Sequence, residues 1–134
     1  AGIPKAYGFE GSPKTIGEHL RKKRIDAKLR QREVAAQLQA PVQSVVSWEV
    51  GRDNPAVKYM PAIIKFLGYD PTPAPETDGQ KLIAYRTTRG WSRKKLAETV
   101  GVDYWTIHRW EADVQPRSAR HRNLLKRILS ETTD

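Results

Sequence analysis

The sequence predicts an all-α protein built from two tandem helical bundles joined by a proline-rich linker. Three observations support this fold class: apolar residues recur at helical spacing, no segment alternates as a strand would, and one pattern occurs twice. The chain has 134 residues, of which 38% are hydrophobic, enough for one ordinary core or two very small ones.

The repeat aligns residues 29–49 with residues 91–111, at an offset of 62. Between the copies lies an acidic, proline-rich tract, DPTPAPETD, which cannot hold a helix. We therefore expect an N-terminal arm at 1–13, a first domain at 14–69, a linker at 70–78 and a second domain at 79–134. The matched residues are Leu20/Leu82, Arg24/Arg86, Val34/Leu96, Ala35/Ala97, Leu38/Val100, Val45/Ile107 and Trp48/Trp110.

In the first copy, Thr15 can cap the first helix, with Glu18 at the reciprocal capping-box position. Residues 39–41 form a tight turn between the second and third helices, and Gly68 ends a closing helix. The expected helices are residues 16–28, 31–38, 42–50 and 60–67.

In the second copy, Ser92 can cap the second helix and Asp103 the third. Gly101 supplies the left-handed residue that a tight turn between them requires. Four apolar residues on one face of residues 119–129 predict a closing helix there.

The charge balance favours a polyanionic partner, because 24 Lys and Arg face 15 Asp and Glu, a net charge of +9. Double-stranded DNA is the leading candidate. No apolar run approaches the roughly 20 residues of a membrane span, and the first thirty residues hold no secretory segment. We expect a soluble, cytoplasmic, nucleoid-associated protein with no membrane partner.

Catalysis and metal binding are not expected. The chain has no cysteine, which excludes disulfides and thiolate ligands. His19, His108 and His121 show no ligand spacing, and no nucleophile has an acid-base partner nearby in sequence. We therefore predict that the protein is not an enzyme and needs no metal, cofactor or small-molecule ligand.

Each copy resembles the lambda-repressor-like helix-turn-helix domain of the XRE family of bacterial and phage regulators. The resemblance covers about residues 14–68 and 78–131. It rests in the first copy on Gln31, Val34, Ala35, Val45 and Glu49, and in the second on Leu96, Ala97, Gly101, Val102, Ile107, Trp110 and Glu111. The second copy has Arg93 instead of the glutamine, and the first has Gln39 and Pro41 instead of the usual turn glycine and cap.

The resemblance implies a sequence-specific DNA-binding transcription regulator of prokaryotic or phage type. It also implies structural ion pairs, Arg24 with Glu49 and Arg86 with Glu111. A carboxylate at a helix C-terminus opposes the helix dipole, so its presence in both copies suggests compensation by a charged donor.

The third helix of each copy is the expected recognition helix, whose exposed side chains would meet base edges in the major groove. Gln43 suits adenine, Val42 a thymine methyl group and Arg109 guanine, whereas the direction of His108 is left open. Tyr104 and Trp105 could instead form a local apolar cluster or a protein contact. The predicted base-reading residues are Val42, Gln43, Ser44, Ser47, Tyr104, Trp105 and Arg109.

Phosphate contacts are expected at the start of the second helix of each copy, where backbone N–H groups favour an anion, and in the loop after the first recognition helix. The alternative is that these residues form ordinary solvated charged faces. The predicted phosphate-binding residues are Arg30, Gln31, Arg52, Asn54, Lys58, Ser92, Arg93 and Lys94.

Two functions follow from this pattern. Two recognition helices in one chain can read adjacent major-groove sites. Alternatively, the second domain binds a protein partner or mediates self-association. The charge split favours the second domain for that role, since residues 1–69 carry +6 and residues 70–134 only +3. RNA binding is the weaker option, because the narrow A-form major groove excludes a helix.

Overall fold

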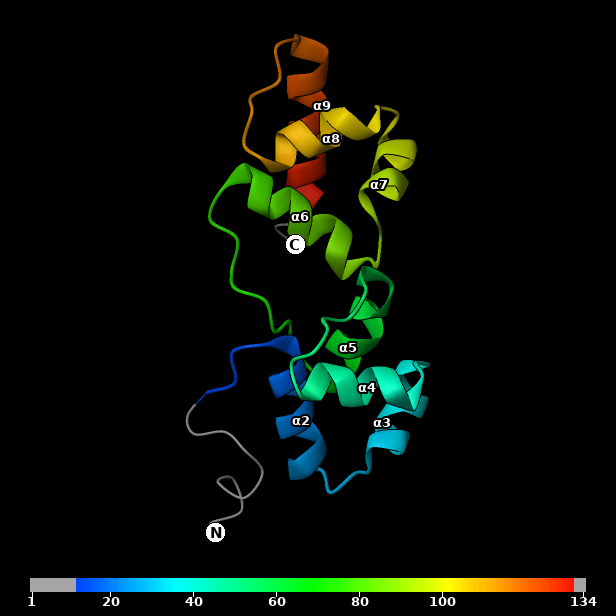
Figure 1. The fold of residues 1–134 in the computed structure, drawn as a ribbon. Coiled ribbons are helices and arrows are strands. Elements are labelled where there is room, and N and C mark those ends of the chain that lie inside the picture. The colour runs from blue at the N-terminus through cyan, green and yellow to red at the C-terminus, as the bar shows by residue number, and fades with distance from the viewer. Residues whose placement is uncertain (1–11, 132–134) are drawn as a thin grey trace. The chain divides into compact units, whose positions relative to one another are not determined.

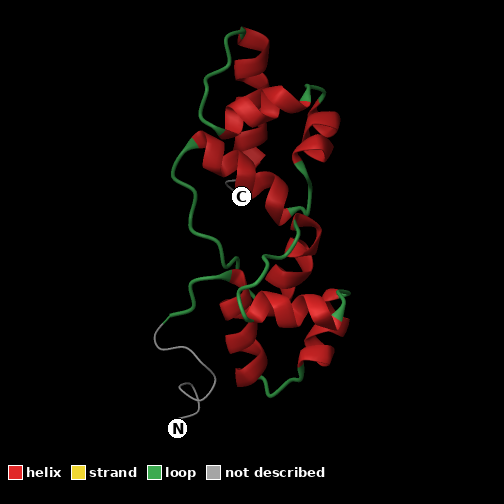
Figure 2. Ribbon diagram, viewed as in Figure 1, coloured by secondary structure: helices red, strands yellow, loops and turns green. Residues whose placement is uncertain are grey.

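The computed structural model describes residues 12–131, and in this range it contains helices and no strands (Figure 2). The predicted all-α fold class is therefore confirmed. Most of the expected N-terminal arm, residues 1–11, lies outside the described residues.

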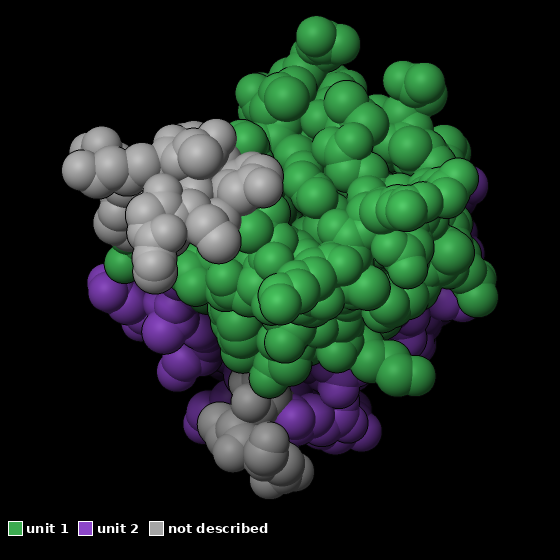
Figure 3. Space-filling view, turned by 90° about the horizontal axis from the view of Figure 1, so that it is seen from below, with its two compact units in different colours: residues 1–72 green, residues 73–134 purple. Residues whose placement is uncertain are grey.

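The chain divides into two compact units, residues 1–72 (unit 1) and residues 73–134 (unit 2), coloured separately in Figure 3. Each unit contains four α-helices in the described range (Figure 1). Unit 1 holds α2 (Ile16–Asp26), α3 (Gln31–Leu38), α4 (Val42–Glu49), the short 3-10 helix η1 (Val57–Tyr59) and α5 (Met60–Leu67). Unit 2 holds α6 (Asp78–Thr88), α7 (Arg93–Val100), α8 (Tyr104–Glu111) and α9 (Ala119–Ser130).

Each unit has its own apolar core. In unit 1, α2 and α3 both pack on α4, and α5 closes the bundle. In unit 2, α6 and α7 pack on α8, and α9 packs on α6. The fully buried side chains include Leu20, Val34, Val45 and Ile63 in unit 1, and Leu82, Leu96 and Ile107 in unit 2.

Most predicted helix caps are confirmed. The side chains of Ser92 and Asp103 accept hydrogen bonds from the backbone N–H groups of Lys95 and Thr106. Gly101 adopts a left-handed conformation, with φ of 82°. Thr77, which was not predicted as a cap, caps α6: its side chain accepts a hydrogen bond from the backbone N–H of Gln80.

The first helix begins at Ile16 with Thr15 as its cap, as predicted, but it differs in the partner of Glu18 and in its last residue. The Glu18 carboxylate accepts from the N–H of Lys14, not of Thr15, because the extended backbone at Thr15 brings the preceding amide within its reach. The helix ends at Asp26 rather than at residue 28, because Lys28 is left-handed and the N–H of Leu29 bonds back to a carbonyl in α2.

Left-handed residues end the first three helices of each unit at an offset of 62. They are Lys28, Gln39 and Gly51 in unit 1 and Gly90, Gly101 and Asp113 in unit 2. After each of them, the next amide bonds back to the helix. Gln39 shows that the turn of unit 1 keeps this geometry without the usual glycine.

Close backbone contact between the first and third helices depends on a glycine in each unit. A Cβ atom on Gly17 would lie 1.8 Å from the carbonyl oxygen of Trp48. A Cβ atom on Gly79 would lie 2.5 Å from the carbonyl oxygen of Glu111. No side chain fits in either position, so α4 and α8 lie directly on the backbones of α2 and α6.

We predict that Gly17→Ala destabilises unit 1 by about 2 kcal/mol or more, because the clash with backbone outweighs the roughly 1 kcal/mol gain in helix propensity. Urea unfolding of the full chain measures this change. Lys23→Ala, at an exposed site on the same helix, is the matched control and should leave the transition nearly unchanged. A Gly17→Ala protein as stable as the parent would contradict the close approach.

Candidate nucleic-acid interface

A tight turn connects two packed helices in each unit. Residues 39–41 join α3 to α4, and residues 101–103 join α7 to α8. Each turn begins with a left-handed residue, and the two helices that it joins are in contact. This is the arrangement by which a helix-turn-helix motif presents its second helix.

The α4 helix buries one face and exposes the other. Val45 and Trp48 lie in the core, whereas Val42 is 40% exposed and Gln43 is exposed. Ser44 and Ser47 are half-buried. The Ser47 hydroxyl donates to the Asp53 carboxylate at 2.7 Å, so it already has a partner within unit 1.

The α8 helix also buries one face and exposes the other, but its exposed side chains differ from those of α4. Ile107 and Trp110 lie in the core, as does Thr106, the counterpart of half-buried Ser44. Arg109 is exposed, and its guanidinium donates to the Thr106 hydroxyl at 3.2 Å. His108, whose direction the sequence left open, is also exposed.

The exposed face of α8 carries two large aromatic side chains. Tyr104 is 39% exposed and Trp105 is 63% exposed. Their ring centroids lie 5.1 Å apart in an edge-to-face arrangement, and the Trp105 ring also contacts His108. The structure thus brings these three rings together at the surface.

In unit 1, a buried carboxylate ties α4 to the two helices before it, α2 and α3. The Arg24 guanidinium donates to both oxygens of Glu49, from Nε at 2.7 Å and from Nη2 at 2.8 Å. It also donates to the carbonyl oxygen of Leu29. The Gln31 amide donates to Glu49 at 3.2 Å, and the Glu49 side chain is only 2% exposed.

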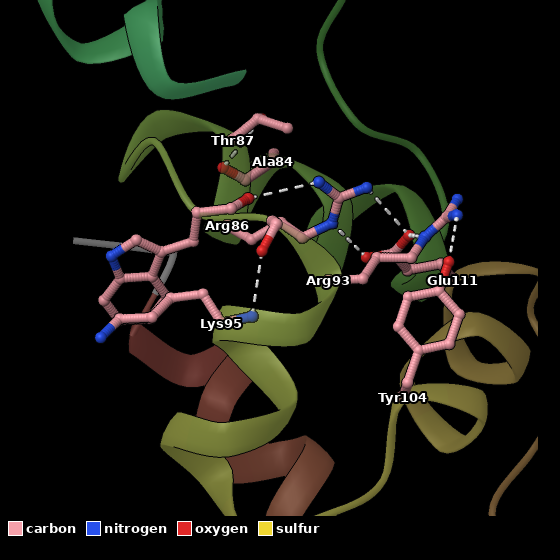
Figure 4. Close-up of polar contacts among 9 residues, drawn as sticks. Ala84, Arg86, Thr87, Arg93, Lys95, Tyr104 and Glu111 are labelled. Atoms are coloured by element: carbon pink, nitrogen blue, oxygen red, sulfur yellow. Dashed lines mark hydrogen bonds and ion pairs between the residues drawn. The ribbon is translucent and has the colours of Figure 1, made fainter. Parts of the chain in front are cut away.

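In unit 2, Arg86 and Arg93 converge on Glu111 (Figure 4). Arg86 donates to both oxygens of Glu111 and to the carbonyl oxygen of Trp91. Arg93 donates from Nε to Glu111 at 2.7 Å and from Nη1 to the Tyr104 hydroxyl at 3.5 Å. The bond to Glu111, and then that to Tyr104, raises the pKa of Arg93 above its ordinary value.

The two clusters therefore differ in charge. Unit 1 pairs one guanidinium and a neutral amide with its carboxylate, whereas unit 2 pairs two guanidiniums with one. The Arg93 side chain is 35% exposed, so the surplus positive charge lies at the start of α7, beside the outer face of α8.

The predicted phosphate-binding residues lie as follows. Gln31 and Arg93 are half-buried and already bonded to the glutamates, each with further N–H groups. The Ser92 hydroxyl accepts from Lys95 as a cap, and its own proton can still be donated. The exposed residues of the set are Arg30, Arg52, Asn54, Lys58, Ser92 and Lys94.

Sequence reasoning missed the basic residues that follow α8. An open cleft of about 520 Å³ lies between α8 and the start of α9, and Arg109, Arg117 and His121 contribute to its lining. All five basic residues of this region are exposed. They are Arg117, Arg120, Arg122, Lys126 and Arg127. The signal was the spacing of the last four within the closing helix, where the prediction used only the apolar positions.

Within residues 12–131, no three His, Asp or Glu side chains gather as metal ligands would. In the same range, no helix is long and apolar enough to cross a membrane.

Comparison with known families gives one match. Residues 20–73 match the helix-turn-helix family HTH_3. The matched segment runs from within α2 past the end of α5, so it contains the packed α3 and α4 helices. No curated protein and no solved structure matches the chain. Over these residues the chain is therefore similar to a DNA-binding helix-turn-helix family of XRE type. The match ends at residue 73 and includes no helix of unit 2.

We predict that Glu111→Ala destabilises unit 2 by about 1–3 kcal/mol, because it leaves two guanidiniums without their buried partner. Urea unfolding followed by tryptophan fluorescence measures the loss. Asp26→Ala, which breaks the exposed Lys22–Asp26 pair, is the control and should leave the midpoint nearly unchanged. Equal effects of the two substitutions would count against the buried network.

Proposed function

We propose that the protein is a sequence-specific regulator that reads duplex DNA with two recognition helices, α4 and α8. The observation that carries the proposal is the recurrence of one buried network at an offset of 62. Arg24, Glu49 and the Leu29 carbonyl have counterparts in Arg86, Glu111 and the Trp91 carbonyl. The contacts that hold α4 in the matched unit thus have counterparts around α8, which supports a second recognition helix in unit 2.

The proposed reading follows from the exposed side chains. Gln43 has the amide that pairs bidentately with adenine, and Val42 offers an apolar contact to a thymine methyl group. Arg109 has the planar fork that fits the O6 and N7 atoms of guanine. The cations around α3 and α7 would hold the phosphates and fix the register of each unit.

Both units can act on one duplex. The residues between α5 and α6, 68–77, can span at most about 33–36 Å when extended, and the freedom of the units adds to that reach. Neighbouring major-groove faces lie about 34–36 Å apart on one side of the duplex. Linking the units raises the effective concentration of the second once the first has bound. Regulation would then act by occupancy of about two helical turns.

We predict that inserting five base pairs between the two half-sites weakens binding by at least about tenfold, because it turns one half-site to the opposite side of the helix. Fluorescence anisotropy with the full chain measures affinity, and a footprint measures coverage. An insertion of ten base pairs, about one helical turn, is the control, because it separates the half-sites further but keeps them on the same side of the duplex. Unchanged affinity after the five-base-pair insertion would refute tandem reading.

We predict that Gln43→Ala and Arg109→Ala each weaken binding to the preferred site by about 1–3 kcal/mol, since each removes a bidentate base contact. Binding to random duplex should hardly change, because the phosphate contacts remain. Lys65→Ala, at an exposed site on α5, is the control and should change neither. If Arg109→Ala weakened all duplexes equally, the residue would be a phosphate contact.

A second candidate function is protein binding through unit 2, and the 63% exposure of Trp105 favours it. In that case Arg109→Ala would leave DNA binding intact at every sequence, whereas Gln43→Ala would not. The pair of substitutions therefore separates the two functions.

A further inference from the structure

Trp105 stands where unit 1 has Gln43, at the second position of the recognition helix. The two side chains cannot do the same chemistry. A glutamine amide donates and accepts, so it can pair with the edge of adenine. An indole has a single N–H donor and a large apolar surface. Unit 2 therefore presents an apolar surface at this position, where unit 1 presents a hydrogen-bonding pair.

Trp105 is held in place by its neighbours. The Tyr104 ring meets it edge-to-face at 5.1 Å, and the His108 ring meets it at 5.5 Å. Tyr104 is itself tied to Arg93, whose Nη1 lies 3.5 Å from its hydroxyl, and Arg93 is anchored on buried Glu111. The exposed indole thus rests on a chain of contacts that ends in the core of unit 2.

Two arginines lie close to Trp105. Arg109 is exposed one turn further along α8, and partly exposed Arg93 is bonded to the neighbouring Tyr104. The carboxylates at the two ends of α8 are both engaged: Asp103 accepts from the N–H of Thr106, and Glu111 is buried between two arginines. The hydrogen bond from Thr106 also lowers the pKa of Asp103.

This combination fits one class of partner. The floor of the DNA major groove offers apolar contact through the C5-methyl group of thymine, and its walls are lined by phosphates. An apolar protein surface would satisfy the indole but would have to desolvate the surrounding cations without partners. Charge complementarity therefore favours the groove.

We propose that Trp105 reads the C5-methyl group of a pyrimidine next to the guanine that Arg109 reads. The inference rests on the proposed function, in which α8 enters the major groove. Trp105 and Arg109 are four residues apart and so lie on the same face of the helix, one turn from each other. Thymine and 5-methylcytosine carry the same methyl group at the same place in the groove. Unit 2 therefore accepts either pyrimidine, and it discriminates against cytosine that is not methylated.

The experiment begins with the site that the full chain selects from random duplexes. Within the half that Arg109→Ala perturbs, each thymine is replaced in turn by uracil, which lacks only the methyl group. At the sensitive position, cytosine and 5-methylcytosine, each paired with guanine, are then compared. The variants are Trp105→Ala, Trp105→Leu and Arg109→Ala, with Val114→Ala as an exposed apolar control in unit 2.

For the unsubstituted protein, we expect one uracil replacement to weaken binding about fourfold, the change that corresponds to burying one methyl group. Methylating the cytosine should strengthen binding by a similar factor. Trp105→Ala should abolish both differences, and Trp105→Leu should keep part of them. Arg109→Ala should lower affinity but keep the methyl dependence, and Val114→Ala should behave as the parent.

The failures are distinguishable. If the full chain selects no duplex sequence, the proposed function itself falls. If it selects a site but thymine and uracil bind equally at every position, Trp105 reads no methyl group. If Trp105→Ala keeps the parent's methyl dependence, another residue is the reader and the inference is wrong. If Trp105→Ala binds every duplex as the parent does, the indole belongs to a protein interface.

Discussion

A single buried carboxylate fixes the third helix of each unit, α4 in unit 1 and α8 in unit 2. Glu49 and Glu111 end their helices, where a negative charge opposes the helix dipole, and both side chains are 2% exposed. Such a charge is tolerated only when it is paired and hydrogen-bonded. An arginine from the first helix and a donor from the start of the second meet this need. The carboxylate therefore sets the positions of three helices at once.

The same arginine also fixes the turn that follows the first helix. Arg24 donates to the Leu29 carbonyl, and the Leu29 amide bonds back to the Arg24 carbonyl. Arg86 does the same with Trp91. The entry into the second helix is thus tied to the ion pair. Since Gly17 and Gly79 also let the backbones of the first and third helices touch, α4 and α8 have little freedom to rotate or slide.

The helix caps, the turns and the outward faces of α4 and α8 could be predicted from the sequence, because they depend on local residue types and spacing. Caps and turns are local: Ser92, Gly101 and Asp103 act through their own backbone, so their residue types are enough. The outward positions of α4 and α8 follow from the buried pair of Val45 and Trp48 and its counterpart. Contacts between distant segments are harder to predict from the sequence. The pairing of Glu49 with Arg24 came from the resemblance to a family and not from the spacing.

The features that the sequence could not predict depend on exact backbone positions in the folded chain. The need for glycine at residue 17 exists only because a carbonyl of α4 approaches α2, although the recurrence of glycine 62 residues later was a visible signal. The end of α2 at Asp26 depends on Lys28 accepting a left-handed conformation, for which lysine has no local preference. The double bonding of Arg93, to Glu111 and Tyr104, requires the start of α7 to lie against the start of α8.

The buried contacts of Glu49 recur around Glu111, whereas the exposed residues of α4 and α8 differ. A symmetric dimer places two identical recognition helices on a duplex, so the site that it reads has two-fold symmetry. In this chain the outer faces differ: Val42 and Gln43 in unit 1 correspond to Tyr104 and Trp105 in unit 2. The surplus charge at Arg93 adds a further difference. Two units joined in one chain and reading adjacent half-sites would therefore favour an asymmetric sequence, and the asymmetry would orient the protein on the DNA.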